Sequence, residues 1–137
     1  MTDSRDALMD AALNRKIDVP SAPEPVGAYP HARRYGSLLF LSGVGPRQRG
    51  RGDIPGVTLS PTGEILKYDI AIQTQAVIDN VRAILEASGS SLEKVIDVQV
   101  FLTNMKADFK TYNEVYAQTF ASIGATRTTV EVGALPT

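Results

Sequence analysis

Residues 124–137 read GATRTTVEVGALPT, and polar and apolar side chains alternate from Arg127 to Val132. Side chains along a β-strand point alternately to its two faces, so this alternation predicts a strand with two unlike faces. The apolar face, which we expect to cover the core, carries Thr128, Val130 and Val132. The polar face carries Arg127, Thr129 and Glu131.

Arg127 is the informative member of the polar face. An arginine cannot be deprotonated in a protein, and its planar guanidinium needs a carboxylate, a phosphate or water as partner. Two interpretations stay open from this strand alone: a salt bridge to a neighbouring strand, or contact with a bound anionic ligand.

The chain ahead of this strand predicts two helices and a further strand. Apolar residues recur at helical spacing over residues 69–88, with Gly89 placed for a C-terminal cap. A second helix is predicted over about residues 108–123, with Asn113 beside its stripe of Phe109, Tyr112, Tyr116, Phe120 and Ile123. Between them, residues 94–103 alternate as a strand whose faces are Ile96, Val98, Val100 and Leu102, and Asp97, Gln99, Phe101 and Thr103.

The N-terminal half is more irregular. Residues 4–16 predict a short helix, and the prolines that follow predict an extended passage, so residues 1–25 are interpreted as a peripheral extension of one domain over 26–137. Residues 32–43, ARRYGSLLFLSG, predict a β-hairpin that turns at residues 35–37. Residues 44–65 predict a loop that carries Arg47, Arg49 and Arg51. This loop is either simply solvated or a mobile lid that brings positive charge to a ligand.

This order of elements predicts an α+β fold in which two helices cover one face of a mixed sheet. The other face would expose Phe101 and its apolar neighbours. Exposed apolar patches of this kind mark interfaces, so a homo-oligomer is expected.

Composition excludes several classes of function. The chain has 137 residues, one histidine, no cysteine and a formal net charge of −1. These counts argue against disulfides, thiolate catalysis and Cys- or His-based metal clusters, and no positive field exists to attract nucleic acid. No apolar run reaches membrane-spanning length, and the first twenty residues lack the apolar core of a signal peptide, so a cytoplasmic protein is expected.

Three segments carry a family resemblance: PVGAYPHARRYGSLLFLSG at 25–43, DVQVFLTNMKADFKTYNEVYAQTF at 97–120 and TRTTVEVGALP at 126–136. With them, roughly residues 23–136 resemble the RidA (YjgF, reactive-intermediate deaminase) family. The pattern R-x-x-V-E-V-x-x-L-P, from Arg127 to Pro136, is its most distinctive part. GAYPHARR, FLSGVGPRQRG and FLTNMKADF look most like the bacterial 2-aminomuconate deaminases within that family.

The resemblance implies a chorismate-mutase-like fold and a homotrimer with one site in each cleft between subunits. It also implies a hydrolase that needs no cofactor and no metal, in which water converts an enamine or imine carboxylate to a ketone and ammonia. The 2-aminomuconate likeness implies 4-oxalocrotonate (2-oxohex-3-enedioate) as product, in the catabolism of aromatic compounds.

The resemblance also assigns residues to the site. Arg127 would bind the substrate carboxylate, Tyr29 and Asn113 would line the cleft as catalytic groups, and Ser42 and Gly43 would lie near the substrate, as would Thr129, which stands where many relatives have cysteine. The alternatives are a half-buried ring for Tyr29, a surface amide for Asn113 and tight packing for the Ser42-Gly43 pair. Because 2-aminomuconate has two carboxylates, Arg47, Arg49 and Arg51 are candidates to meet the far one.

Relatives continue past the L-P pair into one more strand, which usually carries a glutamate that positions the attacking water, whereas this sequence ends at Thr137. No residue is therefore assigned to water activation; Glu131 shares the face of Arg127 but is expected to pair with a basic neighbour. Two other functions stay open: a general deaminase of 2-imino acids such as 2-aminoacrylate, and a ligand-binding trimer without catalysis. A nuclease has little support from the charge or the side chains present.

Overall fold

The structure is a computed structural model that describes residues 13–137. The strands are β1 Asn14–Ile17, β2 Ala32–Tyr35, β3 Leu38–Leu41, β4 Val57–Leu59, β5 Ile65–Tyr68, β6 Asp97–Leu102 and β7 Thr126–Glu131. The helices are α2 Ile70–Ala87 and α3 Met105–Phe120, with a short 3-10 turn, η1, at Leu92–Lys94. Within the described part of the chain, neither helix is both long and apolar enough to cross a bilayer.

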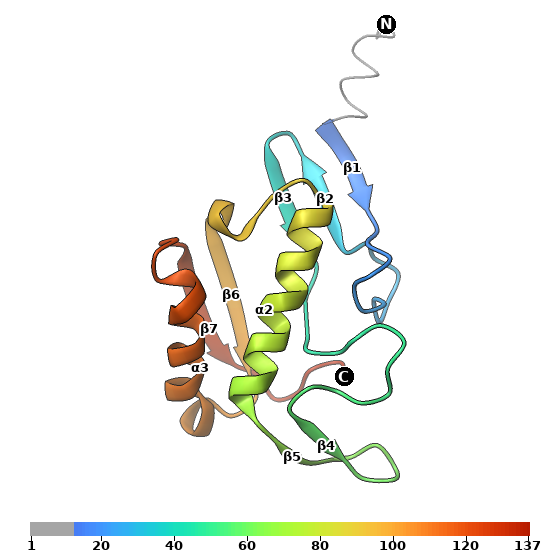
Figure 1. Cartoon of the computed structure of the whole chain (residues 1–137), viewed down its shortest axis with the longest axis vertical. Helices are drawn as coiled ribbons and strands as arrows, with labels where there is room; N and C mark the ends of the chain where they lie inside the picture. Colours follow the sequence, from blue (N-terminus) through green and yellow to red (C-terminus); the bar gives the residue numbers. More distant parts are fainter. Residues whose placement is uncertain (1–12) are drawn as a thin grey trace, which may run out of the picture.

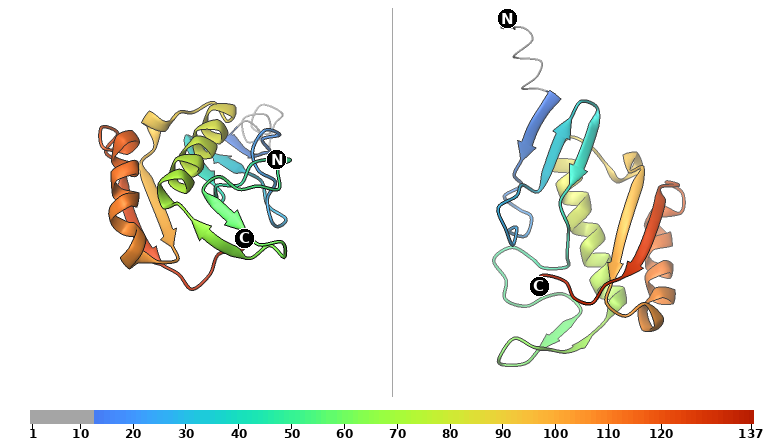
Figure 2. Two further views of the ribbon diagram at one scale, coloured as in Figure 1. Left: turned by 60° about the horizontal axis from the view of Figure 1, so that its bottom comes forward. Right: turned by 180° about the vertical axis from the view of Figure 1, so that it is seen from behind.

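The strands form three small sheets rather than one. β1, β2 and β3 are antiparallel neighbours, β4 pairs with β5, and β6 pairs with β7 in parallel. Both helices lie on the same side of the β1–β2–β3 sheet and of the β6–β7 sheet, as the front and back views show (Figures 1 and 2). The predicted α+β class with two helices on one face is therefore confirmed.

The predicted hairpin and the helix predicted over residues 69–88 are also confirmed. Gly36 makes the β2–β3 turn with a φ of +62°, a left-handed conformation that glycine adopts without steric cost. Asp69 caps α2 by accepting hydrogen bonds from the backbone of Ala71 and Ile72, and Gly89 follows the helix with a φ of +82°. The core comprises two clusters, one around Val19, Ala32 and Ile84 and one around Ile78, Leu85 and Phe120.

The helix predicted over residues 4–16 is wrong from Asn14 onward. Residues 1–12 lie outside the described part of the chain, and Asn14–Ile17 form β1, which pairs with β2. β1 satisfies backbone groups on the free edge of β2 and buries Ile17. Leu13, an apolar residue within the predicted helix, is 40% exposed. Val19 and Ala22 are buried in the first core cluster, so the described part of the presumed peripheral extension is built into the domain.

The long loop also contains structure that sequence analysis missed. β4 and the start of β5 fall within residues 44–65, and they form a short antiparallel hairpin. Tyr68, at the end of β5, donates a hydrogen bond of 2.9 Å to the buried carboxylate of Asp108 on α3. This bond attaches the hairpin to α3 and raises the pKa of the Tyr68 phenol.

The inward and outward faces of β7 are the reverse of the prediction. In the parallel register Arg127 lies beside Val98 and Thr129 beside the buried Val100, so the polar face turns toward α3. Thr128 and Val130 turn to the outer face of the sheet instead. Alternation distinguishes two faces of a strand, but the neighbouring strand and helix decide which of them is covered.

Candidate functional site

Arg127 lies half-buried between β7 and α3. Its Nη2 donates a hydrogen bond of 2.6 Å to Oδ1 of Asn113. Its guanidinium carbon lies 4.6 Å from the ring centre of Tyr116, 5.6 Å from that of Tyr112 and 5.8 Å from that of Phe109. These distances fit cation–π contacts, so the aromatic stripe of α3 holds the guanidinium in place.

No carboxylate pairs with Arg127 among residues 13–137, so the simple salt-bridge interpretation is not what the structure shows. The bond to Asn113 uses one of the five N–H donors of a guanidinium. The others remain available for a planar anion such as a carboxylate.

Two hydroxyl groups near Arg127 are buried and have no hydrogen-bond partner among residues 13–137. They are the phenol of Tyr116 and Oγ1 of Thr129, which follows Arg127 on the same face of β7. A buried polar group without a hydrogen bond destabilises the fold by about 1–3 kcal/mol, so such groups are uncommon and often belong to functional sites. Together with Arg127 they supply hydrogen-bond donors that have no acceptor among residues 13–137.

Burial raises the pKa of the two tyrosines nearest Arg127. It raises the pKa of Tyr112 to about 12, against the opposing effect of the Arg127 charge. Burial also raises the pKa of Tyr116, again against the influence of Arg127. Both phenols therefore keep their protons at neutral pH and can act as hydrogen-bond donors.

Glu131 supports the position of α3. Its Oε1 accepts a hydrogen bond of 2.9 Å from the backbone N–H of Met105, in the first turn of the helix. Asn104 caps the same helix through a hydrogen bond from Ala107. The predicted pairing of Glu131 with a basic neighbour is therefore wrong, because a carboxylate at a helix N-terminus meets both free N–H groups and the positive end of the dipole.

Ser42, Gly43 and Tyr29 lie together elsewhere in the fold. Oγ of Ser42 donates 2.7 Å to the carbonyl of Pro30, and its backbone N–H donates to the carbonyl of His31. Ser42 therefore holds the backbone directly after Tyr29, whose ring is 42% exposed. A Cβ atom added to Gly43 would meet nothing within 4 Å, so tight packing does not explain this glycine within the chain.

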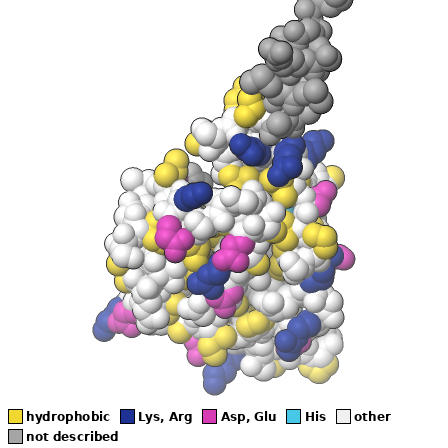
Figure 3. Space-filling model, turned by 45° about the horizontal axis from the view of Figure 1, so that its top comes forward, with side chains coloured by type: hydrophobic (Ala, Val, Ile, Leu, Met, Phe, Trp, Pro, Cys, Tyr) yellow, Lys and Arg dark blue, Asp and Glu magenta, His cyan; other side chains and the backbone are white. Residues whose placement is uncertain are grey.

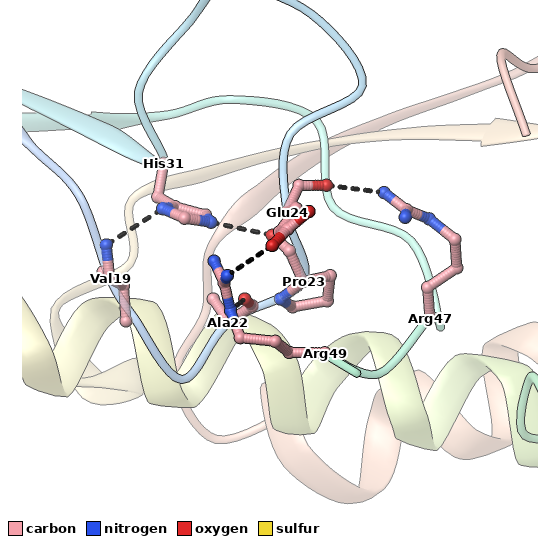
Figure 4. Close-up of polar contacts among 7 residues, drawn as sticks. All are labelled: Val19, Ala22, Pro23, Glu24, His31, Arg47 and Arg49. Atoms are coloured by element: carbon pink, nitrogen blue, oxygen red, sulfur yellow. Dashed lines mark hydrogen bonds and ion pairs between the residues drawn. The ribbon is translucent and has the colours of Figure 1, made fainter. Parts of the chain in front are cut away.

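Arg47 and Arg49 contact the segment before β2 (Figure 4). Arg47 donates 2.9 Å to the carbonyl of Glu24, while Arg49 donates 2.6 Å to the carbonyl of Ala22 and 3.0 Å to the Glu24 carboxylate. Arg51 pairs with its neighbour Asp53 instead, through two hydrogen bonds.

The loop is also fixed from its other side. The buried amide of Asn80 on α2 donates 2.9 Å to the carbonyls of both Gly45 and Arg47. The structure thus shows the first part of the loop anchored to α2 and to residues 22–24.

The predicted site residues therefore fall into two groups. Arg127 and Thr129 on β7 form one group with Asn113 on the facing helix α3. Tyr29, Ser42 and Gly43 form the other with Arg47 and Arg49. The segments that carry this second group lie on the other side of α2 from β7 and α3 in Figure 1. No hydrogen bond or ion pair joins the two groups within residues 13–137.

The outer face of the sheets is apolar and exposed. Phe101 and Val130, on β6 and β7, are 49% and 40% exposed and line a shallow hollow of about 210 Å³. Leu38 and Phe40 on β3 are also exposed. A larger hollow of about 540 Å³ lies between α2, α3 and the loop, but it contains none of the predicted site residues.

Basic side chains gather at the end of the molecule where β1 and β2 lie (Figure 3). The strand register places Arg15 opposite Arg34 and Lys16 opposite Arg33. No ion pair involves these four side chains in the part of the chain that is described. Within residues 13–137, no group of three histidine, aspartate or glutamate side chains is arranged to hold a metal ion.

The family model described as endoribonuclease L-PSP matches residues 19–137. The chain belongs to this family, the RidA family. A RutC family protein of Pyrococcus horikoshii is 44% identical over 125 residues, which cover 90% of this chain and 89% of that protein. A protein of Dermatophagoides farinae named 2-iminobutanoate/2-iminopropanoate deaminase is 33% identical over 123 residues, or 89% of this chain and 86% of that one.

Solved RidA structures share the fold. The crystal structure of Escherichia coli TdcF with bound serine has a TM-score of 0.73 and 34% identity, and the match covers 89% of this chain and 88% of that one. The RidA resemblance seen in the sequence is therefore confirmed. Sequence analysis assigned no role to Tyr112 and Tyr116, whose helical spacing is that of ordinary packing residues; their contact with Arg127 needs the fold.

Proposed function

We propose that this RidA protein is a deaminase that hydrolyses the enamine or imine form of a 2-amino carboxylate, and that 2-aminomuconate is its substrate. The observation that carries the proposal is the fixed guanidinium of Arg127, which has no carboxylate partner in the described chain and lies near two unused hydroxyl groups. The name of the Dermatophagoides farinae relative, a 2-imino acid deaminase, and the serine bound to TdcF agree with a site for a small 2-amino acid derivative.

The reaction needs little more than positioning. The enamine takes a proton on carbon to become an iminium ion, which is already electrophilic beside its carboxylate. Water adds to the iminium carbon, a proton moves to nitrogen, and the C–N bond breaks to leave a ketone and ammonia. Holding the carboxylate and the water in place is therefore the main task of the protein.

Arg127 is assigned to the carboxylate. Two parallel N–H donors of its guanidinium match the two carboxylate oxygens, and each charge-assisted bond contributes about 1.5–3 kcal/mol. Asn113 orients the guanidinium through the 2.6 Å hydrogen bond. Thr129 and Tyr116, whose hydroxyl groups have no partner within residues 13–137, are assigned to donate to the substrate or to the attacking water.

The second carboxylate of 2-aminomuconate is assigned to Arg47 and Arg49. Their contacts with residues 22–24 hold both guanidinium groups while leaving further N–H donors of each without a partner in residues 13–137. Because this group lies across the molecule from Arg127, the proposal includes a homotrimer in which Arg127 of one subunit faces the loop of the next. The exposed Phe101 and Val130 are available to form that interface.

Ammonia release tests the function. The purified protein is given freshly made 2-aminomuconate, and loss of its ultraviolet absorbance is followed together with ammonia. The comparison substrate is the imine that a pyridoxal-phosphate dehydratase makes from serine or threonine. Faster turnover of 2-aminomuconate supports the proposal, equal or faster turnover of the small imine supports a general imine deaminase, and release from neither refutes both.

A further inference from the structure

His31 is the one histidine of the chain, and its buried ring contacts two backbone groups of the segment before β2 (Figure 4). Nδ1 accepts a hydrogen bond of 2.9 Å from the N–H of Val19. Nε2 lies 2.8 Å from the carbonyl of Pro23. A backbone N–H can only donate and a carbonyl can only accept, so these partners select the neutral ring with its proton on Nε2.

The backbone that His31 holds also carries the partners of the two loop arginines. Pro23 lies between Ala22, whose carbonyl accepts from Arg49, and Glu24, whose carbonyl accepts from Arg47 and whose carboxylate pairs with Arg49. In Figure 4 the Arg47 guanidinium lies across this short segment from the imidazole, and the Arg49 guanidinium lies between the Ala22 carbonyl and the Glu24 carboxylate. A shift of residues 22–24 would therefore move the anchors of both arginines.

We propose that His31 is a positioning residue that sets substrate selectivity: its neutral ring holds residues 19–24 in the shape that presents Arg47 and Arg49 to a second carboxylate. This inference rests on the proposed function, since it concerns how the site distinguishes dicarboxylate from monocarboxylate substrates. His31 touches no substrate in this role. It acts through the backbone of Pro23 and through Glu24.

The arrangement makes selectivity depend on pH. A protonated imidazole donates from both nitrogens, so Nδ1–H would face the Val19 N–H and that hydrogen bond would be lost. The charged groups drawn with the ring in Figure 4 are Glu24, on the same segment, and Arg47 and Arg49, on the loop. Acid that protonates this ring should therefore weaken dicarboxylate recognition.

The test compares full-length wild type with His31→Gln and His31→Phe. The readout is selectivity, the ratio of kcat/KM for 2-aminomuconate to kcat/KM for the imine made from serine. Glutamine carries one donor and one acceptor that do not titrate, whereas phenylalanine fills the space of the ring with neither. We expect His31→Phe to lower selectivity about tenfold through a higher KM for the dicarboxylate, the effect of losing one or two hydrogen bonds.

The pH profile supplies the second readout and does not require His31→Phe to fold. Wild-type selectivity should fall on acidification, and that of His31→Gln should stay level. A folded His31→Phe protein with wild-type selectivity, or a His31→Gln profile parallel to that of the wild type, overturns the inference. The proposed function fails separately, if wild-type protein releases no ammonia from either substrate.

Discussion

Replacing Arg127 tests the site most directly, because every proposed step begins with its grip on the carboxylate. Arg127→Ala removes both bonds of a bidentate guanidinium–carboxylate pair, at about 1.5–3 kcal/mol each. The sum, about 3–6 kcal/mol, corresponds to a loss in kcat/KM of about 10²- to 10⁴-fold, since 1.4 kcal/mol equals a factor of ten. Arg127→Lys keeps the charge but not the fork, so it should lose about half of that free energy.

The same change also has a cost in stability. Arg127→Ala removes the 2.6 Å bond to Asn113 and the contacts with three aromatic rings. A hydrogen bond and partly buried cation–π contacts together contribute about 1–3 kcal/mol to the free energy of unfolding. Activity is therefore measured well below the melting temperature of the variant.

Steady-state ammonia release and urea unfolding measure the two effects. Arg82→Ala is the matched control, because Arg82 lies on α2 and pairs at the surface with Asp79 three residues away, a contact worth only a few tenths of a kcal/mol. It should change neither activity nor stability appreciably. A folded Arg127→Ala protein with kcat/KM within threefold of wild type would show that the guanidinium does not bind the substrate.

Three further results are expected. Arg47→Ala and Arg49→Ala should each raise KM for 2-aminomuconate about tenfold in steady-state kinetics, because each loses a charged hydrogen bond to the substrate. Arg51→Ala should leave KM unchanged, because the Arg51 guanidinium pairs with Asp53. Equal KM values for all three variants and the wild type would reject a role for the loop. Phe101→Glu should dissociate the oligomer in sedimentation velocity, while Ile72→Glu on α2, 50% exposed where Phe101 is 49% exposed, should not; an intact Phe101→Glu oligomer would place the interface elsewhere. Tyr112 keeps its proton in the fold up to about pH 12 while the unfolded chain loses it near pH 10, so the free energy of unfolding should fall as pH rises through that window, and Tyr112→Phe should reduce the fall when unfolding is measured at several pH values.

Turn and helix-capping residues in the sequence correctly predicted the elements that they bound. The β2–β3 hairpin follows from Gly36, and α2 follows from its apolar period between Asp69 and Gly89. β1 was missed because what stabilises it is not local: its backbone pairs with the edge of β2, and its Ile17 packs into the core. A short segment with weak periodicity takes its conformation from such a partner.

Sequence analysis named candidate site residues but could not predict their contacts. The resemblance pointed to Arg127 and Asn113, yet the rings that surround the guanidinium lie on α3, and alternation alone assigned the apolar face of β7 to the core. The anchors of Arg47 and Arg49 were equally out of reach, because Glu24 precedes them by more than twenty residues and Asn80 follows them by more than thirty. Pairings at such separations depend on the tertiary fold.

The separation of the two groups of site residues argues for an assembly that repeats head to tail. β7 and α3 lie at one edge of the molecule, and the loop with residues 22–24 lies at the other (Figure 1). A closed ring brings unlike edges of neighbouring subunits together, so one rotation would place Arg127 opposite the loop at every interface. In the lone chain Asn113 is the only hydrogen-bonding partner of the Arg127 side chain among residues 13–137. If a complete site takes two subunits, specific activity must fall on dilution as the oligomer dissociates, in parallel with its mass.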